Sequence, residues 1–249
     1  MAFVTDGQVH YSGIQNELDT IDAINDLNLF EQPVVHLGGT GHTADAVGGA
    51  NLSIKLKKSI KTGSFDYVNS TRLAKGIIHH FGDFLDYVSE LRQLSVPERR
   101  SSVDELRERF ADECDACLDN MSSEEIIEIL QDTMIDHHSD IDYMVVSDQS
   151  TNKIYMYSPD NHPVVGYLKR GLDVMLVSSG RARSSRQICF VNDDGSLIQT
   201  GLRIRVTSNN GVSAFLGLGS NKNSSVVVKI QQDSVDKMLA AVSPDCYSV

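Results

Sequence analysis

The stretch HTADAVGGANLSIKLKK, residues 42–58, determines how the rest of the chain is interpreted. A Gly-Gly-Ala-Asn turn at residues 48–51 separates two segments that read as the arms of a β-hairpin. In the second arm, apolar residues at 52, 54 and 56 alternate with polar residues at 53, 55 and 57. This period of two is typical of a half-buried strand and predicts a hairpin over residues 43–58.

The polar face of this hairpin carries residues suited to phosphodiester hydrolysis. Asp45 lies on the first arm, and Ser53 and Lys55 share one face of the second arm because they are two residues apart. If the arms pair in register, the carboxylate and the ammonium converge beside the backbone carbonyl of Ile54. A carboxylate can bind Mg²⁺, which activates a bound water. A nearby lysine can orient that water or stabilise the developing charge.

The D-x7-S-x-K pattern on a hairpin that follows a helix resembles the core of the PD-(D/E)xK, or restriction-endonuclease-like, nuclease superfamily. The resemblance covers about residues 13–70. It implies an α+β fold (mixed α/β), with a central mixed sheet flanked by helices. It also implies a Mg²⁺-dependent DNA endonuclease of the type II restriction or phage and resolvase kind, with Mn²⁺ as a substitute metal. The products would be a 5′-phosphate and a 3′-hydroxyl.

The resemblance also implies roles for individual residues. Asp45 and the Ile54 carbonyl would bind the metal, and Lys55 would assist the attacking water, with Ser53 beside them in the catalytic site. Ser53 stands where the family usually has a second carboxylate, and Ala44 stands where proline is common. The missing acid must then come from another part of the chain.

Glu17 is our candidate for this second metal ligand and catalytic acid. Residues 13–27 read as a helix capped by Ser12, and at about 100° per residue Glu17 falls within its apolar stripe. A charge on a buried face is costly unless it is paired or bound to a metal. Resolvase-like members of the superfamily place a metal-site glutamate on the equivalent first helix. Glu31, just before the first strand, is the alternative.

The remainder of the chain reads as helices followed by short strands. We expect helices over residues 71–94, 102–120 and 123–135, the last two with capping boxes at Ser102 and Ser122. Beyond residue 141 strands dominate, until a final helix over residues 231–242. The expected organisation is a nuclease core with a helical insertion over residues 1–140. A β-rich basic part, continuous with the core and contacting DNA, follows over residues 141–249.

The distribution of charge permits a DNA partner. The net charge of −12 is concentrated in residues 90–150, which carry 5 Lys/Arg against 17 Asp/Glu, whereas residues 151–249 carry 11 against 7. A local basic face is sufficient for tracking phosphates. The expected DNA-binding residues are Lys57, Lys58, Arg181, Arg183, Arg186, Arg203 and Arg205.

Other motifs favour ordinary structural roles. Cys114 and Cys117 form a lone CxxC without a second ligand pair, so helix packing is the better interpretation. The run DHHSDID at residues 136–142 is better explained as a solvated loop, and His42 as a turn residue. No apolar run is long enough to span a bilayer, and no signal peptide is recognised. We expect a cytoplasmic protein of a bacterium or a phage-infected host.

Two rival functions stay open at this point. The first is a non-enzymatic phage structural or assembly protein, in which Glu17 has no functional role. The second is a nuclease fold that binds DNA but has lost catalysis, with Ser53 marking the loss. Cutting both strands of DNA would require two active sites, and therefore a homodimer. Burial of Glu17 next to Asp45 and Lys55 would count against a structural protein.

Overall fold

The chain folds into two compact units that interleave along the sequence. The computed structural model describes residues 6–38, 44–57, 64–70, 80, 82–178, 185–208 and 224–249. Unit 1 comprises Met1–Phe65, Gln131–Arg170 and Gln231–Val249, and unit 2 comprises Asp66–Leu130 and Gly171–Ile230. The chain passes between the units four times, so the expected division at residue 140 falls inside unit 1.

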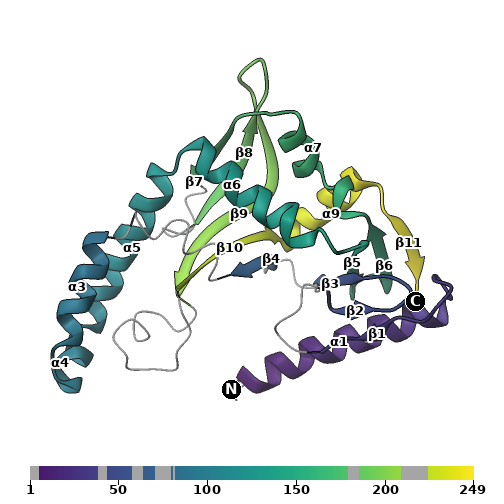
Figure 1. Ribbon diagram of the computed structural model, residues 1–249, viewed down its shortest axis with the longest axis horizontal. Helices are drawn as coiled ribbons and strands as arrows, with labels where there is room; N and C mark the ends of the chain where they lie inside the picture. Colours follow the sequence, from purple (N-terminus) through teal and green to yellow (C-terminus); the bar gives the residue numbers. More distant parts are fainter. Residues whose placement is uncertain are drawn as a thin grey trace. The chain divides into compact units, whose positions relative to one another are not determined.

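Unit 1 is built on a six-stranded mixed sheet (Figure 1). Its strand order is β1-β2-β3-β5-β6-β11, and β3–β5 is its one parallel pair. The strands are β1 Val35–His36, β2 Ala46–Val47, β3 Leu52–Lys57, β5 Tyr143–Asp148, β6 Lys153–Tyr157 and β11 Asp245–Ser248. Together with the helices, this arrangement confirms the α+β class. Strand β3 ends the antiparallel hairpin and begins the parallel pair, so it lies at the centre of the sheet.

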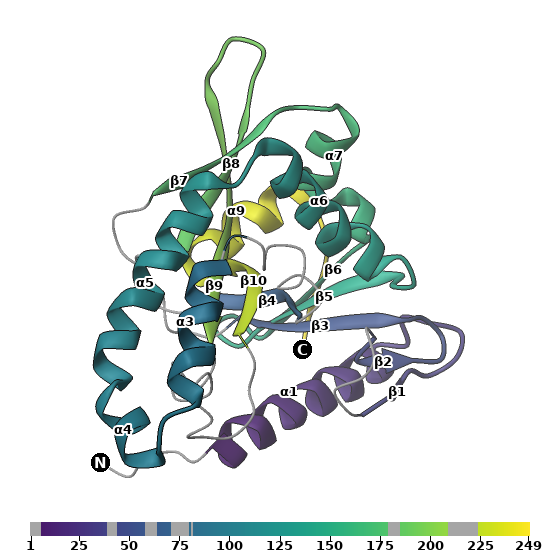
Figure 2. The same cartoon turned by 60° about the vertical axis from the view of Figure 1, so that its left-hand side comes forward.

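Helix α1, Asp6–Asp26, covers one face of this sheet, and Figures 1 and 2 show it running along β1–β3. Ile21 and Ile24 are buried against Leu52 and Ile54 of β3. Their period of three matches the apolar stripe expected for a helix that packs by one side. The helix begins before Ser12, so the prediction of Ser12 as its N-cap is wrong.

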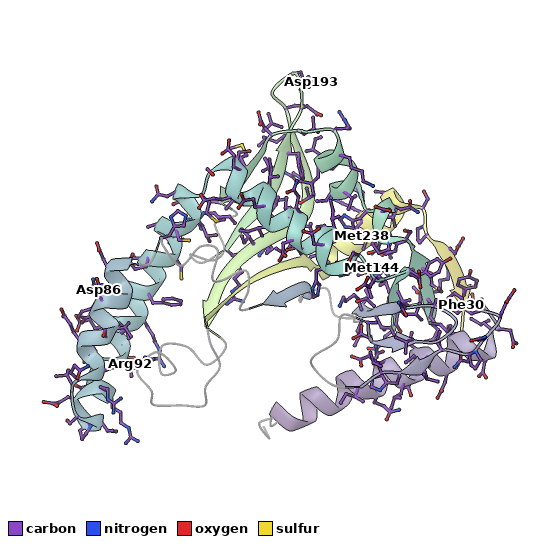
Figure 3. The ribbon with its side chains drawn as sticks, in the orientation of Figure 1. Phe30, Asp86, Arg92, Met144, Asp193 and Met238 are labelled. Carbon is purple, nitrogen blue, oxygen red and sulfur yellow. The ribbon has the colours of Figure 1, made fainter. Side chains whose placement is uncertain are left out.

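The opposite face of the sheet carries the polar positions of β3. Ser53 pairs with Met144, and Lys55 pairs with Val146, both of which are buried. Because side chains alternate along a strand, all four lie on the face away from α1. Figure 3 marks Met144 on β5 and Met238 on α9, both of them buried in unit 1. The further helices of unit 1 are η2 Asp136–His138, η3 Pro159–Asn161, α7 Pro163–Lys169 and α9 Gln232–Val242.

Unit 2 joins a five-stranded sheet, in the order β4-β10-β9-β8-β7, to the helices of the middle segment. Helix α5 packs on β8 and β9, where its Cys114, Cys117 and Leu118 are buried. The strands are β4 Ser64–Ser70, β7 Val174–Ser178, β8 Ser185–Val191, β9 Leu197–Ser208 and β10 Ser224–Gln231. The helices are α3 Gly82–Arg92, α4 Val96–Ser101, α5 Val103–Asn120 and α6 Ser123–Met134, the last of which continues into unit 1.

Of the two predicted capping boxes, the one at Ser122 is present and the one at Ser102 is not. Ser122 and Glu125 form the predicted capping box at α6, where the Glu125 N–H donates to the Ser122 hydroxyl and the Ser122 N–H donates to the Glu125 carboxylate. The box predicted at Ser102 is wrong, because the Ser102 hydroxyl donates to the carbonyl of Glu98 instead. The described part of the chain contains no helix that is long and apolar enough to cross a membrane.

The turn between β2 and β3 depends on two glycines. Gly48 adopts a φ of +132°, which L side chains rarely adopt, and a Cβ there would lie 2.5 Å from the Pro33 carbonyl oxygen. A Cβ on Gly49 would collide with the carbonyl oxygen of Gln32 and lie 2.7 Å from the Cβ of Phe30. The turn is therefore packed against the segment that leads into β1, and this packing fixes where β3 begins.

We predict that Gly49→Ala lowers the free energy of unfolding by about 1–3 kcal/mol, because backbone atoms must move to admit the methyl group. Gly166→Ala is the matched control, since Gly166 lies in α7 with nothing within 4 Å of its added Cβ. There the same methyl group should be neutral or stabilise by up to about 1 kcal/mol. Urea unfolding of the two variants measures both effects, and equal stabilities would contradict this account of the turn.

Candidate active site

Asp45 and Ser53 meet where the pairing of β2 with β3 ends. The Asp45 N–H donates to the carbonyl of Leu52 at 2.8 Å, and the Asp45 carboxylate accepts from the Ile54 N–H at 2.6 Å. The Ser53 hydroxyl lies 3.5 Å from the same carboxylate oxygen, Oδ2. The hairpin therefore pairs in the register that places Asp45 opposite Ser53, as the sequence predicted.

The Ile54 carbonyl points to the same side of β3 as Asp45. Backbone groups of Asn51 and Lys57 bond toward β5, since their carbonyls accept from the N–H groups of Asp142 and Gln149. Successive peptide groups of a strand point to opposite edges, so those of Leu52 and Ile54 point toward β2. The Leu52 carbonyl bonds to Asp45 on that edge. Two hard oxygen groups, the Asp45 carboxylate and the Ile54 carbonyl, thus belong to one edge of β3.

Lys55 lies on the same face as Ser53 and is half-buried. Its positive charge acts on His138, a buried histidine that follows α6 in the chain. Asp45, Ser53 and Lys55 therefore belong to one continuous face of the hairpin. That is the arrangement expected from their spacing in the sequence.

Glu17 has a different partner from the one expected. Its Oε2 lies 2.9 Å from Nε2 of His36, and the two side chains are 28% and 19% exposed. His36 pairs with Ala46, whose side chain is buried in the core beneath α1. Asp45 precedes Ala46 and so belongs to the opposite face. No contact described in the structure joins Glu17 to Asp45 or Lys55. The alternative acid, Glu31, is exposed.

Lys57 is directed into unit 1. Its ammonium lies 2.9 Å from Oδ2 of Asp148 and 2.5 Å from Oδ1 of Asp236, and its side chain is 11% exposed. Burial by itself would lower the pKa of Lys57, but the hydrogen bonds to Asp236 and Asp148 outweigh it and the pKa is raised. The ammonium therefore carries its charge inside an ion-pair network. The sequence did not reveal this, because both partners come from distant segments.

The basic residues expected to contact DNA in unit 2 fall into two groups. Arg186 is buried, and its guanidinium lies 2.9 Å from Asp115 and from Asp119 on α5. Arg203 is half-buried and Arg205 is exposed, both on β9. Within the described residues, Arg205 is thus the most accessible of the expected DNA contacts. Lys58, Arg181, Arg183 and His42 lie outside the described residues.

The remaining motifs have structural explanations. Cys114 and Cys117 are buried in the packing of α5, and burial raises the pKa of both thiols. The expectation of a solvated loop over residues 136–142 is wrong in part, because Asp136–His138 form the helix η2 and His138 is buried, with its Nδ1 2.8 Å from the carbonyl oxygen of Thr133. Among the described residues, no group of three His, Cys, Asp or Glu side chains is arranged to hold a metal ion.

The donors present fit Mg²⁺ in part. Asp45 and the Ile54 carbonyl supply two of the hard oxygen ligands that Mg²⁺ prefers, and this ion commonly keeps several waters. Ser53 adds a neutral hydroxyl beside them, in place of a second carboxylate. Glu17 does not complete this set from its position against His36.

Comparison of the chain with models of protein families, with curated proteins and with solved structures found no match.

Two buried histidines of unit 1, His138 and His162, interact electrostatically with each other, and His138 also interacts with Lys55. Burial, together with the charges of Lys55 and His137, lowers the pKa of His138 to about 4. Burial, together with the charge of His138, lowers the pKa of His162 to about 3. Nδ1 of His162 accepts from the Val164 N–H at the start of α7, so this histidine is also a helix cap. Both side chains are neutral at pH 7.

We predict that the protein loses stability between pH 6.5 and pH 4.5. As the pH falls below about 6.5, histidines in the unfolded chain become protonated. In the folded protein, His138 becomes protonated only near pH 4 and His162 only near pH 3, so protonation favours the unfolded chain. Each histidine should lower the free energy of unfolding by up to about 1.4 kcal/mol per pH unit in this window.

His162→Asn tests this prediction, because asparagine keeps an N-cap acceptor but does not titrate. Urea unfolding at pH 7, 6 and 5 should show a shallower pH dependence in the variant than in the wild type. Identical slopes for the two proteins would contradict the assignment of buried neutral histidines.

Proposed function

We propose that the protein is a Mg²⁺-dependent DNA endonuclease whose active site is built on the β2–β3 hairpin of unit 1. The observation that carries the proposal is the contact of Asp45 with Ser53 and the Ile54 N–H, on the hairpin face that also bears Lys55. This is the D-x7-S-x-K pattern in the register that its chemistry needs. The mixed sheet with a first helix on one face agrees with the fold that the resemblance implies.

Each residue of the hairpin has a distinct task in this proposal. Asp45 and the Ile54 carbonyl hold the metal, whose chemistry is to activate a water and neutralise charge on the phosphate. The hydrogen bond from the Ile54 N–H fixes the Asp45 carboxylate before substrate binds, which reduces the reorganisation needed during the reaction. Lys55 orients the attacking water and stabilises the charge that develops on the phosphate oxygens.

Glu17, the expected second metal ligand, has a partner other than Asp45. Glu17 is paired with His36, so the criterion that favoured an enzyme over a structural protein, a Glu17 buried next to Asp45 and Lys55, is not met. Asp45, Ser53 and Lys55 support the nuclease by their own arrangement. A nuclease fold that binds DNA without cutting it shares this geometry, and cleavage is the property that separates the two.

We predict that the wild type cuts plasmid or phage DNA with Mg²⁺ and leaves 5′-phosphate and 3′-hydroxyl ends. Lys55→Met and Asp45→Asn should each lower the cleavage rate by at least about 100-fold, the scale typical of removing a group that stabilises a transition state. Asparagine at position 45 retains an oxygen that accepts from the Ile54 N–H, so the hairpin is expected to stay folded.

Lys237→Met is the matched control, since Lys237 is an exposed lysine of α9 in the same unit. It should retain wild-type cleavage. Absence of cutting by the wild type on linear, supercoiled and branched DNA, with DNA binding retained, would favour the non-cutting fold. Absence of both cutting and binding would favour the structural or assembly protein.

A further inference from the structure

The ion-pair network around Lys57 contains one positive and two negative groups. One ammonium meets two carboxylates, those of Asp148 and Asp236, and all three residues belong to unit 1. Asp148 alone neutralises Lys57. The carboxylate of Asp236 therefore adds one uncompensated negative charge beside the ammonium.

The two carboxylates are held very differently. The Asp148 side chain is 1% exposed, and its Oδ2 bonds Lys57 while its Oδ1 accepts from the N–H and the hydroxyl of Ser150. The Asp236 side chain is 72% exposed and reaches Lys57 from the surface of α9. Removing Asp148 would leave a buried ammonium without its buried partner, whereas the exposed Asp236 carboxylate can move into water at little cost.

The position of Lys57 relates this network to the candidate active site. Lys57 follows Lys55 by two residues on β3 and so lies on the same face, roughly 6.6 Å further along the strand. Both lysines face away from α1, as do Asp45 and Ser53. A nucleic-acid backbone that brings one phosphate to Lys55 thus passes close to Lys57.

We propose that Lys57 is a phosphate subsite, which the Asp236 carboxylate occupies in the free protein and a DNA backbone phosphate takes over on binding. The proposal rests on the proposed nuclease function and adds a regulating residue to it. The phosphate replaces one charge-assisted hydrogen bond with another, and Asp148 keeps the ammonium neutralised throughout. The Asp236 carboxylate then competes with the DNA phosphate for the Lys57 ammonium.

The test is the affinity of a fluorescein-labelled 30-base-pair duplex measured by anisotropy in EDTA, so that no cleavage occurs. Asp236→Asn should bind the duplex about two- to fivefold more tightly than wild type, because an exposed ion pair no longer has to be broken. Asp245→Asn is the matched control, since it removes the same charge from an exposed position of unit 1 that lies outside the network. Its affinity should stay close to wild type.

The double variant Lys57→Met/Asp148→Asn removes the subsite while leaving no unpaired buried charge. It should bind the duplex more weakly than wild type, because one charge-assisted hydrogen bond to a backbone phosphate is lost. Adding Asp236→Asn to this background should then give no further gain in affinity. A gain that persists there would overturn the proposal, because it would reflect net charge alone.

The comparison of Asp236→Asn with Asp245→Asn decides the proposal even if the double variant does not fold. Equal affinities of these two single variants, with DNA still bound, overturn the phosphate subsite and leave the nuclease proposal standing. Absence of DNA binding by the wild type and all variants overturns both.

Discussion

Unit 1 depends on one constraint, that β3 is bonded along both edges and packed against α1 on one face. It pairs with β2 on one side and with β5 on the other, and Leu52, Ser53 and Ile54 are all buried. A slip of one residue would turn Lys55 and Lys57 into the core beneath α1 and bring Leu52 and Ile54 to the other face. The apolar packing of α1 therefore fixes which face of the hairpin presents its polar residues, and the proposed chemistry follows from that packing.

The features that the sequence predicted are those encoded within a few residues. Alternation over residues 52–57 specified β3, and the Gly-Gly turn specified the hairpin. The capping box at Ser122 needed only the glutamate three residues later. Where several caps compete, local rules were insufficient. Ser95 forms the box with Glu98, whereas the equally plausible Ser102 donates to the Glu98 carbonyl.

The features that escaped prediction join distant parts of the chain. The helical position of Glu17 predicted a metal-binding role for it, but Glu17 is half-buried and pairs with His36, which lies on a two-residue strand with no pattern of its own. Lys57 was expected to contact DNA, and its ion pairs escaped prediction because Asp148 lies 91 residues away and Asp236 lies 179 residues away. The interleaving of the two units has the same cause, since no local signal marks where the chain leaves one unit for the other.

Ser53 changes the balance of charge at the proposed active site. A carboxylate at position 53, opposite Asp45, would place two negative charges close together in a partly buried site, and both could be ionised only at a cost or with a cation between them. The serine hydroxyl instead lies 3.5 Å from Asp45 Oδ2 as a neutral donor, so it adds no second negative charge beside that carboxylate. In the proposed site, a serine at this position would leave Mg²⁺ with one fewer anionic ligand from the protein. More of the ligands would then have to come from water and from phosphate oxygens, which would couple metal binding to DNA binding.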